Sequence, residues 1–332
     1  MKSAALSLSI LLSAVAALPV RAETSLPTPG AAFWPAKWIG PSAGPQTVYG
    51  VYHFRRVFDL RAKPDHFVIR VSADNRYRLF VNGVSVGFGP QLGSPDQWRY
   101  DRLDLGPYLN AGRNVLAAQV WNYGDEKPYA IMSVKTGLIV QGDGAAEAIA
   151  DTGSDWKVLR DDAYLPISAD QANLHTFIVS GPGDHIDGAS YPWGWTSASY
   201  DDSGWQAPRL LGAGTPSRTG TDGTWWLAPR NIPAMEETPL RLARVRRSEG
   251  ITGAERFVAG GSPLVIPTRS RVTLLLDQGY ETNAFPQLTV SGGRAATITL
   301  TYAESLIDAQ GRKGDRNQVD GKHILPYAQS HA

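Results

Sequence analysis

The chain has 332 residues, of which 34 are glycine, 23 are proline and none is cysteine. Aromatic residues make up 10% and charged residues 19%, a composition that argues against a disordered chain and against a coiled coil. The formal net charge of +1 gives no general electrostatic basis for binding nucleic acid or an anionic membrane. The lack of cysteine excludes disulfide scaffolds, thiolate zinc sites and cysteine nucleophiles. The length allows about two domains.

Residues 1–22 have the pattern of a signal peptide. Lys2 precedes an apolar run over residues 4–18, and Val20 and Ala22 occupy the two positions that a signal peptidase reads. A run of about 15 residues is shorter than the roughly 20 of a membrane-spanning helix, so a cleaved leader is favoured over an anchor. The sequence therefore predicts a linker at residues 23–36 and a mature protein exported to the periplasm or the extracellular space, without membrane association after cleavage.

Short strands are predicted from Trp38 onward. Apolar and polar residues alternate over residues 67–73 and 77–81, and Asn82-Gly83 follows directly. This dipeptide predicts a hairpin, because both positions of such a tight turn require positive φ. Further strands of the first half are predicted at residues 115–121, 131–140 and 156–159. We expect a first β-sandwich at residues 37–230.

The second half shows the same period of two. Its predicted strands are residues 240–245, 271–276, 287–290 and 297–302. No mature segment has ten or more residues of helical period free of glycine and proline, so the fold class is predicted as all-β and antiparallel. Three prolines within residues 228–239 indicate a domain boundary, and residues 240–332 are predicted as a second sandwich.

Motifs for hydrolytic or metal chemistry are weak. Residues 40–44 match G-x-S-x-G, but the flanking prolines place them in a loop and not in a strand-turn-helix elbow. Residues 161–162, 184–187 and 201–203 carry oxygen ligands suited to Ca²⁺, yet each is more simply a turn in which Asp and Ser bind nearby amides. We predict no catalytic residue, no metal site and no cofactor, with a structural Ca²⁺ left as an alternative.

Loop tryptophans offer a hint of ligand binding. Exposed rings give flat apolar faces for sugar C–H groups, and nearby Asp, Asn and Arg supply directional hydrogen bonds. The favoured alternative is that these rings cover the sheet ends and the domain interface. The candidate carbohydrate-binding residues are Asp74, Asn75, Arg76, Trp98, Trp193 and Trp195.

Several segments resemble those of bacterial α-L-rhamnosidases of glycoside hydrolase family 78. In the first half they are residues 34–40, 52–58, 72–83, 87–90 and 200–205. In the second half they are residues 275–279, 285–293, 300–306 and 311–317. The second group is the more specific, because sugar-binding sandwiches of several glycosidase families share the first.

The resemblance implies two sandwiches of the jelly-roll, galactose-binding-like type, the second of them incomplete. It also implies that catalysis belongs to an (α/α)₆ barrel, whose helices this sequence lacks, so no catalytic residue is carried over. We therefore expect an exported N-terminal fragment of an α-L-rhamnosidase-type hydrolase that is inactive alone. Its expected partners are rhamnose-containing glycans or glycosides and a missing or separate helical catalytic module. The alternative is a stand-alone carbohydrate-binding or interaction protein.

Overall fold

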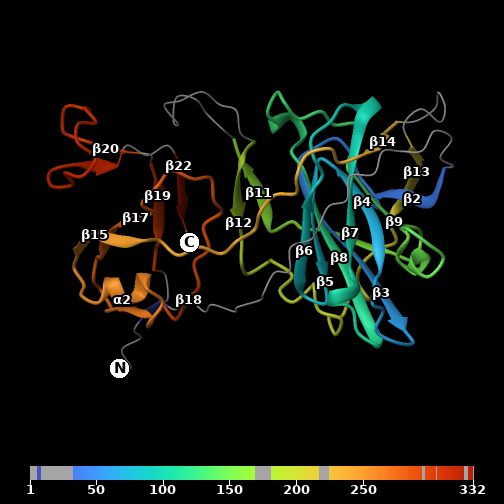
Figure 1. The fold of residues 1–332 in the computed structure, drawn as a ribbon, viewed down its shortest axis with the longest axis horizontal. Coiled ribbons are helices and arrows are strands. Elements are labelled where there is room, and N and C mark those ends of the chain that lie inside the picture. Colours follow the sequence, from blue (N-terminus) through green and yellow to red (C-terminus); the bar gives the residue numbers. More distant parts are fainter. Residues whose placement is uncertain are drawn as a thin grey trace. The chain divides into compact units, whose positions relative to one another are not determined.

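The computed structural model describes residues 6–8, 33–168, 181–216, 224–293, 296–303, 305–324 and 328–331 (Figure 1). The chain separates into two compact units. The large unit comprises Pro19–Asp170 and Ile178–Glu236, and the small unit comprises Met1–Leu18, Gln171–Phe177 and Glu237–Ala332. The border after Glu236 falls in the proline-rich stretch at residues 228–239. The regular elements are almost all strands, which confirms the all-β class.

The first sheet of the large unit has five strands in the order β10-β3-β8-β5-β6, all paired antiparallel. Their bounds are Lys157–Arg160 (β10), Gly50–Leu60 (β3), Gly112–Asn122 (β8), Arg76–Val81 (β5) and Val84–Gly89 (β6). The turn between β5 and β6 is Asn82-Gly83, with φ of 50° and 87°. The predicted hairpin is therefore confirmed, and its glycine meets the requirement for positive φ.

The second sheet closes into a ring in the order β13-β14-β7-β4-β9-β2. Its strands are Arg209–Pro216 (β13), Trp226–Pro229 (β14), Trp98–Asp104 (β7), Val68–Asp74 (β4), Gly137–Gly142 (β9) and Trp34–Gly40 (β2). Strand β14 pairs in parallel with both β13 and β7, so the expectation of a purely antiparallel fold is wrong here. No crossover helix is needed between β7 and β14, because a long stretch of chain separates them in sequence.

The large unit is completed by smaller elements. Strands β11 (Tyr164–Ile167) and β12 (Gly183–Ile186) form an antiparallel ribbon. Single 3₁₀ turns lie at Pro95–Gln97, Gly106–Tyr108, Gly124–Glu126 and Glu147–Ala150.

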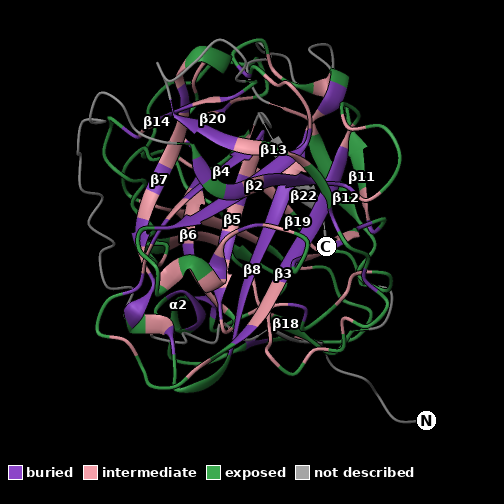
Figure 2. Ribbon diagram, turned by 90° about the vertical axis from the view of Figure 1, so that its right-hand side faces the viewer, coloured by how far each residue is buried: buried purple, intermediate pink, exposed green. Residues whose placement is uncertain are grey.

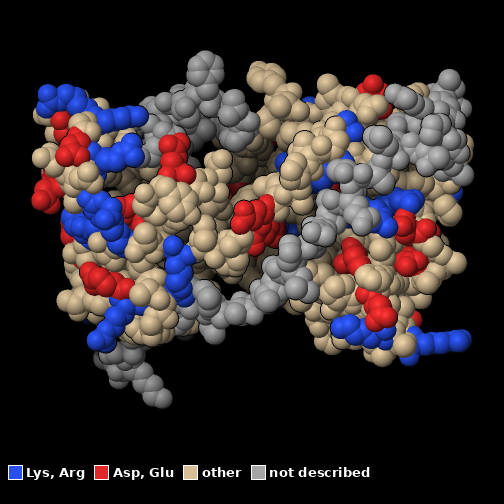
Figure 3. Space-filling model, viewed as in Figure 1, with Lys and Arg blue, Asp and Glu red and all other residues tan. Residues whose placement is uncertain are grey.

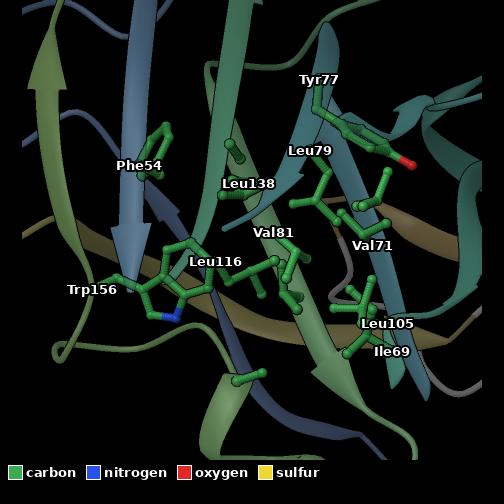
Figure 4. Packing of buried hydrophobic residues seen from close by; sticks show 14 of the residues in the cluster. Phe54, Ile69, Val71, Tyr77, Leu79, Val81, Leu105, Leu116, Leu138 and Trp156 are labelled. Atoms are coloured by element: carbon green, nitrogen blue, oxygen red, sulfur yellow. The ribbon is translucent and has the colours of Figure 1, made fainter. Parts of the chain in front are cut away.

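The main core lies between the two sheets. The apolar residues of β5 alternate with more exposed neighbours, and Tyr77, Leu79 and Val81 are fully buried. They point toward Ile69 and Val71 of β4 (Figure 4). Purple ribbon along β3 and β8 shows the same concentration of buried residues (Figure 2). Because each buried aliphatic side chain contributes about 1.5–3 kcal/mol, this cluster supplies most of the driving force for the sandwich.

Two further clusters explain most of the tryptophans. Inside the ring of strands, Trp38 stacks on Trp225 with ring centroids 4.3 Å apart. On the outer face of the five-stranded sheet, Trp195 and Trp205 pack against residues of β8. These rings therefore pack against strand residues within the large unit.

The small unit has a smaller core. Phe257, Val258 and Leu264 are its main buried cluster. Its strands are Leu6–Leu8 (β1), Arg244–Glu249 (β15), Leu264–Ile266 (β16), Thr273–Asp277 (β17), Val290–Ser291 (β18), Thr299–Tyr302 (β19), Leu306–Ile307 (β20), His323–Ile324 (β21) and Ala328–His331 (β22). They form a three-stranded sheet, β16-β1-β18, and three strand pairs, β15-β17, β19-β22 and β20-β21. One short helix, α2 (Ala254–Val258), packs on β15.

Strand β1 falls within the predicted signal peptide. The remainder of residues 1–32 lies outside the described residues, so export stays a prediction, as does the jelly-roll type of the sandwiches. None of the helices that the structure describes has the length and apolar character needed to cross a membrane.

Candidate functional site

The six predicted carbohydrate-binding residues do not form one surface. Asp74, Asn75, Trp98 and Trp195 are at most 4% exposed, whereas Trp193 is 72% exposed. Trp98 belongs to the cluster inside the ring, and Trp195 lies on the outer face of the other sheet. The sixth, Arg76, is half-buried.

Trp195 has a packing role beside buried polar groups. Its ring centroid lies 4.0 Å from that of His53, whose Nε2 is 2.7 Å from Oδ2 of Asp161. Burial lowers the pKa of His53, while the Asp161 carboxylate opposes that shift. Arg55 donates to Asp202 at 3.0 Å and holds the same covering segment by donating to the Trp195 carbonyl. These contacts bind residues 191–205 to the sheet.

The carboxylates weighed as calcium ligands are engaged by protein groups. Asp161 accepts from the Ala163 amide at 3.0 Å as well as contacting His53, and Asp202 pairs with Lys157 at 2.7 Å. Within the ranges that the structure describes, no group of three or more His, Cys, Asp and Glu is placed to hold a metal ion.

Asp74, at the end of β4, is a structural centre. Its carboxylate accepts five hydrogen bonds, from Asn75 Nδ2, Ser133 Oγ, the Val134 and Lys135 amides and Trp225 Nε1, at 2.6–3.2 Å. Burial raises the pKa of Asp74, and the hydrogen bonds oppose that shift. Because both oxygens are saturated, a ligand reaching Asp74 would have to displace protein donors.

Asn75 aligns the neighbouring strands. Its backbone amide donates to the Trp121 carbonyl at 2.9 Å, and its Oδ1 accepts from the Tyr123 amide at 2.8 Å. These bonds join the start of β5 to the end of β8. As a result Arg76, the first residue of β5, pairs with Trp121 in the sheet.

Arg76 is charged and half-buried, and it stacks on an aromatic ring. Its Cζ lies 4.6 Å from the centroid of the Phe88 ring on β6. Its Nε is buried and has no hydrogen-bond partner, and none of the described residues forms an ion pair with its guanidinium. Burial lowers the pKa of Arg76; Arg230 also lowers this pKa, whereas Tyr123 and Asp101 raise it.

The nearby carboxylate of Asp101 is already occupied. Arg230 Nε donates to one of its oxygens and the Tyr77 hydroxyl to the other. Asp101 and Arg230 are 5% and 9% exposed. A Cβ at Gly89 would lie 2.1 Å from Asp101 Oδ2, so glycine is required for this close approach. Asp101 and Arg230 therefore form a buried ion pair, and Arg76 interacts electrostatically with both of its members.

Tyr123 interacts electrostatically with Arg76. Burial raises the pKa of Tyr123, Arg76 lowers it and Asp184 raises it, so the phenol lies within the electrostatic reach of both charges. Asp184 accepts a hydrogen bond from the Tyr49 hydroxyl at 2.8 Å. We call Arg76, Phe88, Asp101, Tyr123 and Arg230 the Arg76 site.

Sequence reasoning found Arg76 but did not connect it with the rest of this site. Nothing in the local sequence distinguishes Asp101 from the other carboxylates, and Phe88 lies in one of the segments that carry the family resemblance. Arg230 is 129 positions from Asp101 and carries no local signal that would link the two. Their pairing follows from β14 lying beside β7.

Comparison with known proteins places these features in a wider context. No protein-family model matches the chain. An α-L-rhamnosidase of Streptomyces avermitilis is 26% identical over 248 residues, a match that covers 69% of this chain and 20% of the relative. The crystal structure of a glycoside hydrolase family 78 rhamnosidase from Bacillus sp. GL1 matches with a TM-score of 0.56 and 27% identity, covering 67% of this chain and 22% of that one.

The match thus spans about a fifth of the length of each relative. The resemblance seen in the motifs is confirmed by both comparisons. In sequence and in fold, this chain is similar to a portion of the α-L-rhamnosidases.

Proposed function

We propose that this chain is an accessory β-sandwich portion of an α-L-rhamnosidase-type glycoside hydrolase. The observation that carries the proposal is the partial match to two rhamnosidases in sequence and fold. In this proposal the complete enzyme hydrolyses terminal α-L-rhamnosyl residues, and the sandwiches serve a catalytic module by engaging rhamnose-containing glycans. A stand-alone binding or interaction protein is not favoured by these relatives.

The described residues fit an accessory role better than a catalytic one. Their one α-helix has five residues, so the helical barrel that the resemblance implies is not among them. Carboxylates suited to acid–base work, such as Asp74 and Asp101, are saturated by buried hydrogen bonds. Glycoside cleavage needs two carboxyl groups that face one sugar, and a carboxylate whose oxygens are held by buried protein donors is poorly suited to that role.

Export is part of the same proposal. The predicted leader at residues 1–22 would deliver the mature chain to the periplasm or outside the cell, where glycans are met. Figure 3 shows acidic and basic side chains interspersed over the visible face of each unit.

Hydrolysis and binding are tested together. The purified chain is incubated with p-nitrophenyl α-L-rhamnoside, and binding of a rhamnose-terminated oligosaccharide is followed by calorimetry. We expect no release of p-nitrophenol above the buffer control and saturable binding of the oligosaccharide. Release of p-nitrophenol by the chain alone would contradict the accessory role, and absence of binding would contradict the engagement of rhamnose-containing glycans.

A further inference from the structure

We propose that a cavity at the ring of strands binds one terminal, uncharged sugar residue of a glycan. That the ligand is a sugar rests on the proposed function, whereas its size and its neutrality rest on the cavity itself. The cavity has a volume of about 230 Å³. Its walls come from β2, from β13 and from the residues that directly precede β2 and β14.

The first argument is the size of the cavity. A water molecule occupies about 30 Å³ of the liquid, and pockets for drug-sized ligands begin at about 300 Å³. The cavity is therefore larger than a site for one or two waters and smaller than a groove for a chain of sugars. The matching ligand is a single small ring, which a glycan presents at its end.

The second argument is the irregular course of β13 beside the cavity. Its pairing with β2 skips Leu211, which lines the cavity, and a second register shift follows Ala213. A β-bulge leaves its extra residue out of the ladder, so the backbone of Leu211 is not used by β2. Next to it, Gly212 has φ of 129°, and a Cβ there would meet no atom within 4 Å. The bulge thus provides open space and backbone polar groups for a ligand.

The third argument is a buried donor beside the cavity. Trp38 is 1% exposed, and its Nε1 has no hydrogen-bond partner in the described part of the chain. Its Cε3 would lie 3.1 Å from a Cβ at Gly137 of β9, and Cε3 and Nε1 lie on opposite long edges of an indole. The Nε1 edge therefore faces away from β9, toward the side where Gly212 of β13 pairs with Trp38. A sugar hydroxyl in the cavity would supply the acceptor that the protein lacks.

The fourth argument is the chemistry of the walls. None of the cavity residues is charged; they include the aromatic rings of Phe33, Trp38 and Trp225 and the hydroxyls of Thr215 and Thr224. Aromatic rings suit the C–H groups of a sugar, and protein hydroxyls suit its hydroxyls. A charged ligand would lose hydration here without gaining an ion-pair partner. The walls therefore favour an uncharged sugar over a uronic acid or a sugar phosphate.

The indole N–H signals provide the direct test. The full chain, isotope-labelled for NMR, is titrated with methyl α-L-rhamnoside, and the Trp38 signal is assigned by its loss in Trp38→Phe. We expect this signal to shift in a saturable way as Nε1 gains an acceptor. The signal of Trp156, whose Nε1 donates to the Asp151 carbonyl, should stay in place. A Trp38 signal that does not move at saturating sugar would overturn the proposal.

Two substitutions locate the site by affinity, measured by calorimetry. Ala213→Phe fills the cavity and should weaken binding about tenfold or more, whereas Ala145→Phe, at an exposed turn, should not. Thr224→Val removes one hydroxyl and should weaken binding about two- to tenfold, with the exposed Thr47→Val as its control. Circular dichroism checks that the variants are folded. Unchanged affinity in folded Ala213→Phe and Thr224→Val would contradict the proposal.

Three further outcomes separate this inference from the proposed function. Methyl β-D-glucoside should compete with the rhamnoside better than methyl β-D-glucuronide does, and equal competition would overturn the neutral assignment. Saturable binding of a rhamnose-terminated oligosaccharide with an unmoved Trp38 signal would overturn the cavity assignment and leave the proposed function standing. Absence of binding by every rhamnoside would overturn the proposed function and, with it, the choice of a sugar.

Discussion

The regions around Asp74 and Arg76 are adjacent in sequence and opposite in how their charges are satisfied. Asp74 accepts five hydrogen bonds and has no exposed surface. Arg76 is half-buried, and its Nε has no acceptor among the described residues. The difference separates a buried charge whose hydrogen bonding is complete from a half-buried charge that stacks on an aromatic ring.

The largest expected effect is that of Asp74→Ala. The substitution leaves five donors unpaired, and several of them are buried, so we expect the free energy of unfolding to fall by about 5 kcal/mol or more. Asp74→Asn keeps one acceptor oxygen and should lose roughly half as much. Urea denaturation of both variants measures these changes. A loss below about 1 kcal/mol for Asp74→Ala would contradict the structural role.

The next effect is that of Asp101→Asn. It leaves the buried Arg230 guanidinium without its ion-pair partner, and breaking such a pair costs about 3–5 kcal/mol. The control is Asp143→Asn, because Asp143 pairs with Arg70 and Arg102 at a partly exposed position. That control should change the unfolding free energy by about 1 kcal/mol or less. Equal losses for the two variants would show that Asp101 is not a buried partner.

A smaller loss is expected for Gly89→Ala. The added methyl would lie 2.1 Å from Asp101 Oδ2, the oxygen that accepts from the Tyr77 hydroxyl, and must displace it at a cost of about 1–3 kcal/mol. Gly153→Ala is the matched control, since a Cβ there would meet no atom within 4 Å. Thermal unfolding compares the two. If Gly89→Ala is as stable as the control, the close packing at Asp101 is disproved.

The smallest effect is expected for Arg76→Gln without ligand. No hydrogen bond or ion pair to the described residues is lost, and relief of the repulsion from Arg230 offsets the loss of the contact with Phe88, so the unfolding free energy should change by about 0.5 kcal/mol or less. Urea denaturation, as for the Asp74 variants, measures this change in unfolding free energy. A loss above about 2 kcal/mol would mean that Arg76 stabilises the fold, and the contrast with Asp74 would fail.

Local patterns in the sequence were sufficient to predict much of the fold. The alternation over residues 77–81 places three apolar side chains on one face of any strand, and Asn82-Gly83 favours a tight turn whatever surrounds it. Both features depend on neighbouring residues only. The parallel pairing of β14 has no such local cause, because it depends on where a distant strand finds a free edge.

The tryptophans show what could not be predicted from the sequence about the candidate site. Trp193 and Trp195 are two residues apart in the same loop-rich segment, yet one is 72% exposed and the other 3%. Their difference arises because Trp195 packs on the outer face of the five-stranded sheet, beside His53. Sequence composition identifies both as potential sugar platforms and contains nothing that separates them.

By itself, the sequence determined the β class, the hairpin at Asn82-Gly83 and the resemblance to α-L-rhamnosidases, because all three depend on short stretches of chain. Only the tertiary structure decided that Asp74 is closed to ligands and that Asp101 is paired with Arg230. The donors to Asp74 include Ser133 and Trp225, 59 and 151 positions away, and Asp101 is occupied by an arginine 129 positions away. Contacts of that range exist only once the strands have paired, since no local pattern brings these residues together.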